Sequence, residues 1–135
     1  MKIAIDSNRY TDLARGIPEV VELIENAEVV YIPLIVVAEL RAGFAYGTKK
    51  DRNEKILTQF LNADRVFVLN PDEQTAFFYA DIYASLRKKG KPIPTNDIWI
   101  AALCIQHGLV LYDRDQDFDS VPQLARIYTQ LTHLD

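Results

Sequence analysis

The amino-acid sequence predicts an α/β fold, a three-layer α/β/α sandwich built around a short parallel sheet. Short apolar runs that are typical of buried strands alternate with longer segments whose apolar residues recur at helical spacing. Strands separated by helices favour parallel pairing, with helices packed on the sheet. The length of 135 residues suits a single domain over residues 1–135, and a hydrophobic content of 49% is enough for a sizeable core.

The expected strands are short apolar runs. The first, KIAID, ends in an acidic residue and is followed by a helical pattern. Strands are expected over residues 2–6, 28–32, 65–69, 109–112 and 125–128.

Four of the five expected helices are marked by proline near the start or glycine at the end, positions where these residues are well tolerated. The helix over residues 50–63 is expected from the helical spacing of its apolar residues Ile56, Leu57, Phe60 and Leu61. The best-marked segment is PTNDIWIAALCIQHG, in which Thr95 or Asn96 can cap the first turn and Gly108 ends the helix. β-branched residues make the opening of segment 33–47 ambiguous, but its length favours a helix. Helices are expected over residues 18–27, 33–47, 50–63, 71–89 and 94–108.

Composition and charge narrow the possible functions. The net charge of −4 argues against a protein that binds nucleic acid by bulk charge alone. A nuclease stays open, because carboxylates that bind metal are counted here as free negative charge. The single cysteine, Cys104, excludes an intramolecular disulfide and a cysteine-rich zinc site, and its apolar surroundings indicate a core residue. The start lacks a signal-peptide pattern and the apolar stretches are too short to span a membrane, so we expect a cytoplasmic protein.

Four aspartates stand at alternate positions in LVLYDRDQDFDSV, directly after the fourth expected strand. An EF-hand calcium loop would match Asp113, Asp115 and Asp117 at its first, third and fifth positions. It would then need glycine in place of Phe118 and glutamate in place of Leu124, so the match fails. The cluster is therefore not a calcium loop of that kind.

A second alternative starts from Asp6, which follows the first expected strand. Phosphatases of the haloacid-dehalogenase type use an aspartate nucleophile there, with a second aspartate two residues later as general acid. Here that second position is Asn8, and no lysine lies in a comparable strand-end setting. We therefore do not favour a phospho-aspartyl enzyme.

The third interpretation is a metal site built only from carboxylates. Asp6 ends an apolar strand, Glu39 lies among apolar residues of a helix, and Asp97 lies in the first turn of another helix. A fourth acid would come from the aspartate cluster. Each also has a simpler role open to it, as a helix cap, a surface residue or an acid that complements the helix dipole. Oxygen ligands favour Mg²⁺ or Mn²⁺, which activate water for phosphodiester hydrolysis without a side-chain nucleophile, and we interpret His107 and His133 as structural.

Four segments, in chain order, resemble a PIN-domain ribonuclease, and most closely the VapC toxins of bacterial toxin–antitoxin pairs. They are IAIDSNRYTDL, VVAELRAG, PTNDIWIAA and LVLYDRDQDFDSVPQL, and the resemblance spans essentially the whole chain. It implies a Rossmann-like, PIN-like α/β/α sandwich with a short parallel sheet. It also implies an acidic pocket that binds Mg²⁺ or Mn²⁺, and endonuclease cleavage of RNA.

The resemblance also assigns roles to residues of this chain. The catalytic metal ligands that it implies are Asp6, Glu39, Asp97 and Asp115. The supporting polar residues that it implies are Ser7, Asn8, Thr95 and Asn96. The last motif departs from the family, because Asp113 stands where Thr is usual, and this leaves open whether Asp113 or Asp117 adds a ligand. We count Asp117 as a further or water-mediated ligand and expect Asp119 to be a solvent-facing or capping residue.

The partners that the resemblance implies are an RNA substrate, a VapB-like antitoxin that blocks the acidic pocket, and a second copy in a homodimer. Arg9 and Arg41 lie two or three residues from proposed ligands, so they are candidates for contacts to RNA phosphates. The alternative for both is an ion pair with the acidic site. Basic clusters at residues 49–52 and 87–91 are either RNA contacts or solvated helix ends. The rival function is a catalytically silent PIN-like module that binds RNA or a protein, and a DNA nuclease is a third option.

Overall fold

The structure, a computed structural model, describes residues 1–128 and contains a five-stranded parallel sheet. Its strands follow one another in space in the order β3-β2-β1-β4-β5. They are β1 (Lys2–Ile5), β2 (Val29–Pro33), β3 (Val66–Leu69), β4 (Val110–Asp113) and β5 (Arg126–Tyr128). All five expected strands are therefore present, and their ends lie within one residue of the predicted ends.

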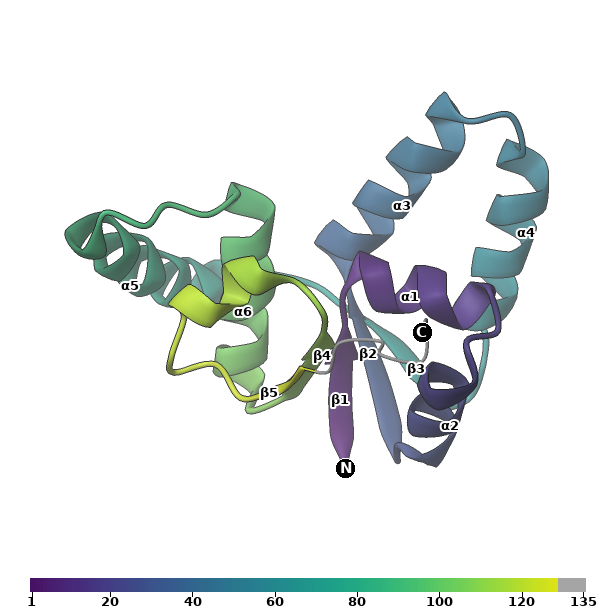
Figure 1. The fold of residues 1–135 in the computed structure, drawn as a ribbon, viewed down its shortest axis with the longest axis horizontal. Coiled ribbons are helices and arrows are strands. Elements are labelled where there is room, and N and C mark those ends of the chain that lie inside the picture. The colour runs from purple at the N-terminus through teal and green to yellow at the C-terminus, as the bar shows by residue number, and fades with distance from the viewer. Residues whose placement is uncertain (129–135) are drawn as a thin grey trace, which may run out of the picture.

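Helices cover both faces of this sheet (Figure 1). The helices between β1 and β3 are α1 (Ser7–Ala14), α2 (Pro18–Asn26), α3 (Leu34–Tyr46) and α4 (Lys50–Leu61). Those between β3 and β4 are α5 (Glu73–Lys89) and α6 (Thr95–His107). The chain moves outward from β1 to β3 and then returns to β4, so right-handed crossovers place the two groups on opposite faces. The predicted three-layer α/β/α sandwich is confirmed.

The chain changes direction across the sheet between β1 and β4, which are neighbours although far apart in sequence. Ile5 of β1 is level with Tyr112 of β4, so Asp6 and Asp113 come next at the same edge of the sheet. In open parallel sheets, ligands bind outside the carboxyl ends of the strands at such a point. The fold therefore brings two of the predicted acidic segments together.

Several helix ends lie where the sequence places them. Gly90 and Gly108 end α5 and α6 in the left-handed conformation, with φ of 66° and 63°. Asp72 caps α5 by accepting a hydrogen bond from the backbone N–H of Thr75 at 3.1 Å. The prediction that Thr95 or Asn96 caps α6 was wrong. Pro94 occupies the N-cap position, and no side chain forms a capping hydrogen bond at this end of the helix.

Two further differences concern the ends of strands. Pro33 is the last residue of β2, and α3 begins at Leu34 instead of at the proline. The segment after β4 contains a short 3₁₀ helix, η1 (Gln116–Ser120), that the sequence did not predict. The 3₁₀ helix follows from local hydrogen bonds after the strand end, which a hydrophobic pattern does not report.

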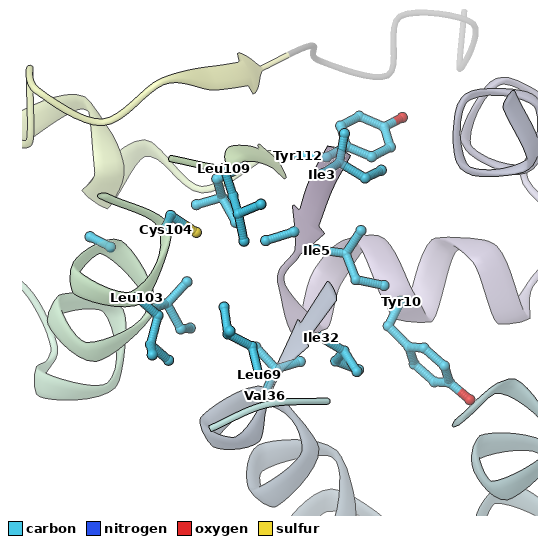
Figure 2. Packing of buried hydrophobic residues seen from close by; sticks show 14 of the residues in the cluster. Ile3, Ile5, Tyr10, Ile32, Val36, Leu69, Leu103, Cys104, Leu109 and Tyr112 are labelled. Carbon is cyan, nitrogen blue, oxygen red and sulfur yellow. The ribbon is translucent and has the colours of Figure 1, made fainter. Parts of the chain in front are cut away.

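The core lies between the sheet and both helical layers (Figure 2). Ile3 and Ile5 of β1 and Leu103 of α6 are fully buried within it. Cys104 is also fully buried, as predicted, and burial raises the pKa of its thiol to about 12. Within residues 1–128, no helix has the length and apolar character needed to cross a membrane.

Candidate active site

Asp6 lies at the carboxyl end of β1 and caps helix α1. Its Oδ1 atom accepts a hydrogen bond from the backbone N–H of Arg9 at 2.8 Å, so the simpler role considered for Asp6 is real. The residue is only 4% exposed. Burial, and then the nearby charges of Asp113 and Asp115, raise the pKa of Asp6 to about 7 despite this hydrogen bond. The carboxyl group therefore lies where added positive charge would be favourable.

Three other carboxylates converge beside it. Asp97, Asp115 and Asp117 each offer one oxygen atom, and these three atoms all lie within 4.8 Å of one another. Asp97 comes from the first turn of α6, and the other two come from the segment after β4. Burial raises the pKa of Asp97 to about 7, and the charges of Asp115, Asp117, Glu39 and Asp6 add to the effect. All the predicted acidic residues therefore lie within electrostatic reach of Asp97.

Glu39 reaches the site from α3. Its Oε2 atom accepts a hydrogen bond from Nδ2 of Asn96 at 3.3 Å, and Asn96 directly precedes Asp97 in α6. Glu39 is half-buried, which fits its predicted place at the edge of the apolar face of the helix. Asn96 thus supports the site through a contact to Glu39.

The segment after β4 is held by hydrogen bonds between residues two apart. Oδ1 of Asp113 accepts a hydrogen bond from the backbone N–H of Asp115 at 3.0 Å, and Oδ1 of Asp115 accepts one from the N–H of Asp117 at 2.9 Å. Aspartate side chains form such local turns readily. The alternate spacing of these aspartates therefore has a structural cause.

Asp113 and Asp119 both pair with Arg126 of β5. Asp113 is fully buried, and its two carboxylate oxygens accept hydrogen bonds from Arg126 at 2.7 and 2.9 Å. The Asp119 side chain is 61% exposed, as expected, and its Oδ1 atom lies 2.6 Å from Nη1 of Arg126. The geometry thus brings Asp117, and not Asp113, to the group of carboxylates.

The expectation for Arg9 needs correction. Its side chain has 0% exposure and lies over the ring of Tyr112 at 4.3 Å, with Nη1 3.4 Å from Asp12 and Nη2 donating to the backbone carbonyl of Asp113 at 3.1 Å. A side chain buried in this way does not reach an RNA phosphate. Arg9 forms an ion pair with Asp12, which is not one of the predicted ligands and not the partner that the alternative named.

Arg41 lies on the surface and pairs with Glu54, so that α3 is linked to α4. Its Nε atom is 2.8 Å from Oε1 of Glu54, and its side chain is 49% exposed. The alternative of an ion pair with the predicted acids is therefore not what the structure contains. Contact with an RNA phosphate stays a prediction for Arg41.

The remaining predicted residues lie at helix ends. Ser7 and Thr95 are the first residues of α1 and α6, and Asn8 follows Ser7 and is half-buried. His107 is exposed at the end of α6, where a cation suits the helix dipole, and His133 lies outside the described residues. The basic residues Lys49, Lys50, Arg52, Arg87, Lys88, Lys89 and Lys91 are all exposed.

Two arginines at the site were missed from the sequence. Arg114 donates to both carboxylate oxygens of Asp12, at 2.9 and 3.2 Å, and so ties the segment after β4 to α1. Arg126 ties the same segment to β5 through Asp113. The unusual acid at position 113 was the one available indication, because an acid at a buried strand end requires a cationic or hydrogen-bonding partner.

Comparison with known proteins decides the family. A family model described as PIN domain matches residues 3–124. The chain belongs to the PIN domain family. This PIN domain is 30% identical over 126 residues to Ribonuclease VapC1 of Haemophilus influenzae strain R2866, covering 89% of this chain and 92% of that protein. It is 35% identical over 121 residues to Toxin FitB of Neisseria gonorrhoeae, covering 84% and 87%.

The fold of this PIN domain also matches a solved structure. The VapBC2 complex from Rickettsia felis, bound to a DNA fragment from its promoter, superposes with a TM-score of 0.84 at 26% identity, over 95% of this chain and 98% of that chain. The identities and coverages place the chain with the VapC ribonucleases. The resemblance inferred from the four sequence segments is thereby confirmed.

Proposed function

We propose that this PIN domain is a metal-dependent endoribonuclease that hydrolyses RNA phosphodiester bonds and acts as the toxin of a VapBC-type toxin–antitoxin pair. The observation that carries the proposal is the group formed by Asp97, Asp115 and Asp117, with Asp6 and Glu39 beside it. The group lies at the switch point of the sheet, in a chain related to ribonucleases. These acids are the catalytic residues of the proposal.

The donor set fits a hard divalent cation, Mg²⁺ or Mn²⁺. Every proposed ligand is a carboxylate oxygen, which these ions prefer over the nitrogen and sulfur ligands typical of zinc sites. The raised pKa values of Asp6 and Asp97 report a site that disfavours further negative charge. A bound cation would offset that repulsion. When bound, such an ion would polarise the phosphate and lower the pKa of a water molecule.

The protein's own residues arrange the acids for this role. Asp97, Asp115 and Asp117 would hold the cation, and Asp6 and Glu39 would complete its surroundings. Asn96 restrains Glu39 through their hydrogen bond. Helices α1 and α6 both have their N-termini at the site, where the helix dipoles favour anionic groups. The proposed reaction uses water as the nucleophile, so no side chain forms a covalent intermediate.

Cleavage assays with purified protein test the proposal. RNA should be cut in the presence of Mg²⁺ or Mn²⁺, and cutting should stop when EDTA is added. The substitutions Asp97→Asn and Asp115→Asn should abolish nearly all cleavage while the protein stays folded. Asp64→Asn, an exposed change between α4 and β3, is the matched control. Undiminished cleavage by Asp97→Asn would contradict the assignment of the site.

The rival function predicts a different result in the same experiment. A catalytically silent module would cut neither RNA nor DNA, and Mn²⁺ would leave its melting temperature unchanged because no cation binds. An active enzyme should be stabilised by Mn²⁺, since ligand that binds the folded state raises the free energy of unfolding. Cleavage of DNA but not RNA would support the third option, a DNA nuclease.

The proposed protein partner is a VapB-like antitoxin. An apolar groove of about 390 Å³ runs along α1 and α4 and is lined by Tyr10, Ala14, Ile56 and Phe60. Tyr10 itself is only 4% exposed, and its buried hydroxyl has no hydrogen-bond partner among the described residues. Because α1 begins directly after Asp6, a segment that runs along α1 toward its first residue would approach the acidic site. Binding of a synthetic antitoxin tail should therefore weaken in an Ile56→Asp variant.

A homodimer and a cytoplasmic location complete the proposal. The aromatic side chains of Phe67 in β3 and Phe77 in α5 are 50% and 66% exposed, and they are candidates for residues that a second copy would cover. Light scattering of the purified protein tests the dimer. Cell fractionation tests the location, which follows from the proposed RNA substrate.

A further inference from the structure

We propose that Asp113 and Arg126 act together as a positioning pair that sets the backbone of Asp115 and, through it, the carboxylates of the acidic site. This inference rests on the proposed function, because it gives the pair a role only if Asp115 and Asp117 bind the cation. Neither Asp113 nor Arg126 is proposed to touch the metal or the RNA.

The pair itself is a two-point ion pair with little exposure to water. Nε and Nη2 of Arg126 donate to Oδ2 and Oδ1 of Asp113 at 2.9 and 2.7 Å. The Asp113 side chain is 0% exposed and that of Arg126 is 13% exposed. The planar guanidinium matches both carboxylate oxygens at once, which a lysine ammonium cannot do.

The same two side chains hold both backbone polar groups of Asp115. Oδ1 of Asp113 accepts a hydrogen bond from the Asp115 N–H at 3.0 Å. Nη2 of Arg126 donates to the Asp115 carbonyl oxygen at 3.0 Å. The peptide groups on either side of Asp115 are thus fixed by one ion pair, which restricts the direction in which its carboxylate points.

The orientation of Asp115 in turn affects the position of Asp117. Oδ1 of Asp115 accepts the Asp117 N–H at 2.9 Å and caps η1, so the start of this short helix depends on the orientation of Asp115. Asp117 belongs to the group of three carboxylates. Arg126 of β5 therefore helps to position two of the three proposed ligands, Asp115 and Asp117. The third, Asp97, is held by helix α6.

Arg126 is itself well fixed. Nη1 lies 2.6 Å from Oδ1 of Asp119, and the guanidinium lies 4.7 Å from the ring centre of Tyr128. These contacts leave few rotamers open to the side chain. Substitution of a residue that orients a metal ligand in this way commonly lowers metal affinity about 10- to 100-fold.

The test compares Arg126→Met and Arg126→Lys with wild type in the Mn²⁺ concentration at half-maximal effect, measured both as thermal stabilisation without RNA and as RNA cleavage. We expect this concentration to rise roughly 10-fold or more in both variants, with a smaller change in kcat at saturating Mn²⁺. Arg65→Met is the matched control, because Arg65 also donates to backbone carbonyls but directly precedes β3, away from the acids. It should lower stability without changing the response to Mn²⁺.

A second comparison separates positioning from general stability. Asp113→Asn keeps an oxygen acceptor for the Asp115 N–H but removes the buried charge. If the two residues act as a pair, Arg126→Met should have much less effect on the half-activating Mn²⁺ concentration in the Asp113→Asn background than alone. This double variant also lacks an unpaired buried charge, so it serves if Arg126→Met alone fails to fold.

The outcomes are distinguishable. Variants with half-activating Mn²⁺ concentrations within twofold of wild type, or with independent effects of the two substitutions, would overturn the positioning pair and leave the proposed nuclease intact. A wild-type protein with no metal-dependent cleavage and no stabilisation by Mn²⁺ would overturn both. Loss of activity only in Asp115→Asn, with Arg126→Met unaffected, would assign the ligand and reject the pair.

Discussion

Asn96 donates a hydrogen bond to Glu39, and this contact joins helices α6 and α3 across the acidic site. The distance from Nδ2 to Oε2 is 3.3 Å, and Glu39 is the one proposed metal residue supplied by α3. The sequence pointed to both residues for separate reasons. Their contact gives Asn96 a definite task, which is to hold the carboxylate of Glu39.

We therefore predict that Asn96→Ala lowers kcat/KM for RNA cleavage about fivefold, because a solvent-exposed hydrogen bond to a charged group contributes about 1 kcal/mol. Asn96→Asp should cost more, since it places a second carboxylate beside Glu39. Cleavage kinetics at saturating Mn²⁺ provide the measurement. Asn26→Ala, at the end of α2, is the control, and equal losses in the two alanine variants would contradict a local role.

The raised pKa values of Asp6 and Asp97 predict how stability depends on pH when no metal is present. Both pKa values are about 7, against an ordinary value of 3.8, so the folded state holds these protons more tightly than the unfolded state. The stability from the two protonated groups is therefore fully present below pH 3.8 and is lost as the pH rises to about 7.

Asp97→Asn removes one of these ionisations. In EDTA at pH 8 we expect the variant to have a free energy of unfolding about 1 kcal/mol higher than wild type, and a smaller advantage at pH 5. Urea unfolding at both pH values measures this. Asp64→Asn should show no such pH-dependent gain, and a less stable Asp97→Asn at pH 8 would refute the electrostatic argument.

Protons and cations should compete for the same carboxylates. Cleavage should rise as the pH increases through 7, because Asp6 and Asp97 must ionise to bind the metal. Raising the Mn²⁺ concentration should move the midpoint of this rise to lower pH. Cleavage rates measured over a range of pH values at several Mn²⁺ concentrations test this. A midpoint that does not shift with the Mn²⁺ concentration would contradict metal binding by these two groups.

Because Arg9 is buried, we expect its substitution to change the stability of the protein, whereas the loss of a phosphate contact would change RNA binding. Arg9→Met should lower the free energy of unfolding by about 3 kcal/mol, because it breaks a buried ion pair. Arg41→Met, which breaks an exposed pair, should change it by less than about 1 kcal/mol. If Arg41 contacts an RNA phosphate, its substitution should also flatten the salt dependence of RNA binding by about one charge. A fully stable Arg9→Met would be inconsistent with the structure.

Sequence reasoning located the parts of the site that depend on regular structure. Asp6 was found because an acid ended an apolar strand, and Asp97 because an acid opened an apolar helix. The rule that sites form at the carboxyl ends of parallel strands then placed both near the aspartate cluster. Helix and strand periodicity, together with this rule, were sufficient for these residues.

The rest depended on contacts between side chains that are distant in sequence. Nothing in the pattern around Arg9 distinguishes a buried arginine from an exposed one, and Arg126 lies thirteen residues from Asp113 on another strand. Asp117 was given a secondary place because the 3₁₀ turn that directs it toward Asp97 has no hydrophobic periodicity. Such features follow from packing and local hydrogen bonds, which composition and spacing do not encode.

The hydrogen bonds within residues 113–117 have a consequence for how this segment can change in evolution. Each bond joins a carboxylate to the amide two residues later, so it forms only at that separation. A different acceptor, such as Asn or Thr, can replace an aspartate at the first position, but an insertion or deletion inside this segment breaks the bond that spans it. Among relatives, we expect insertions and deletions between β4 and β5 to fall after Ser120, with the five residues from Asp113 to Asp117 constant in number even where their identities differ.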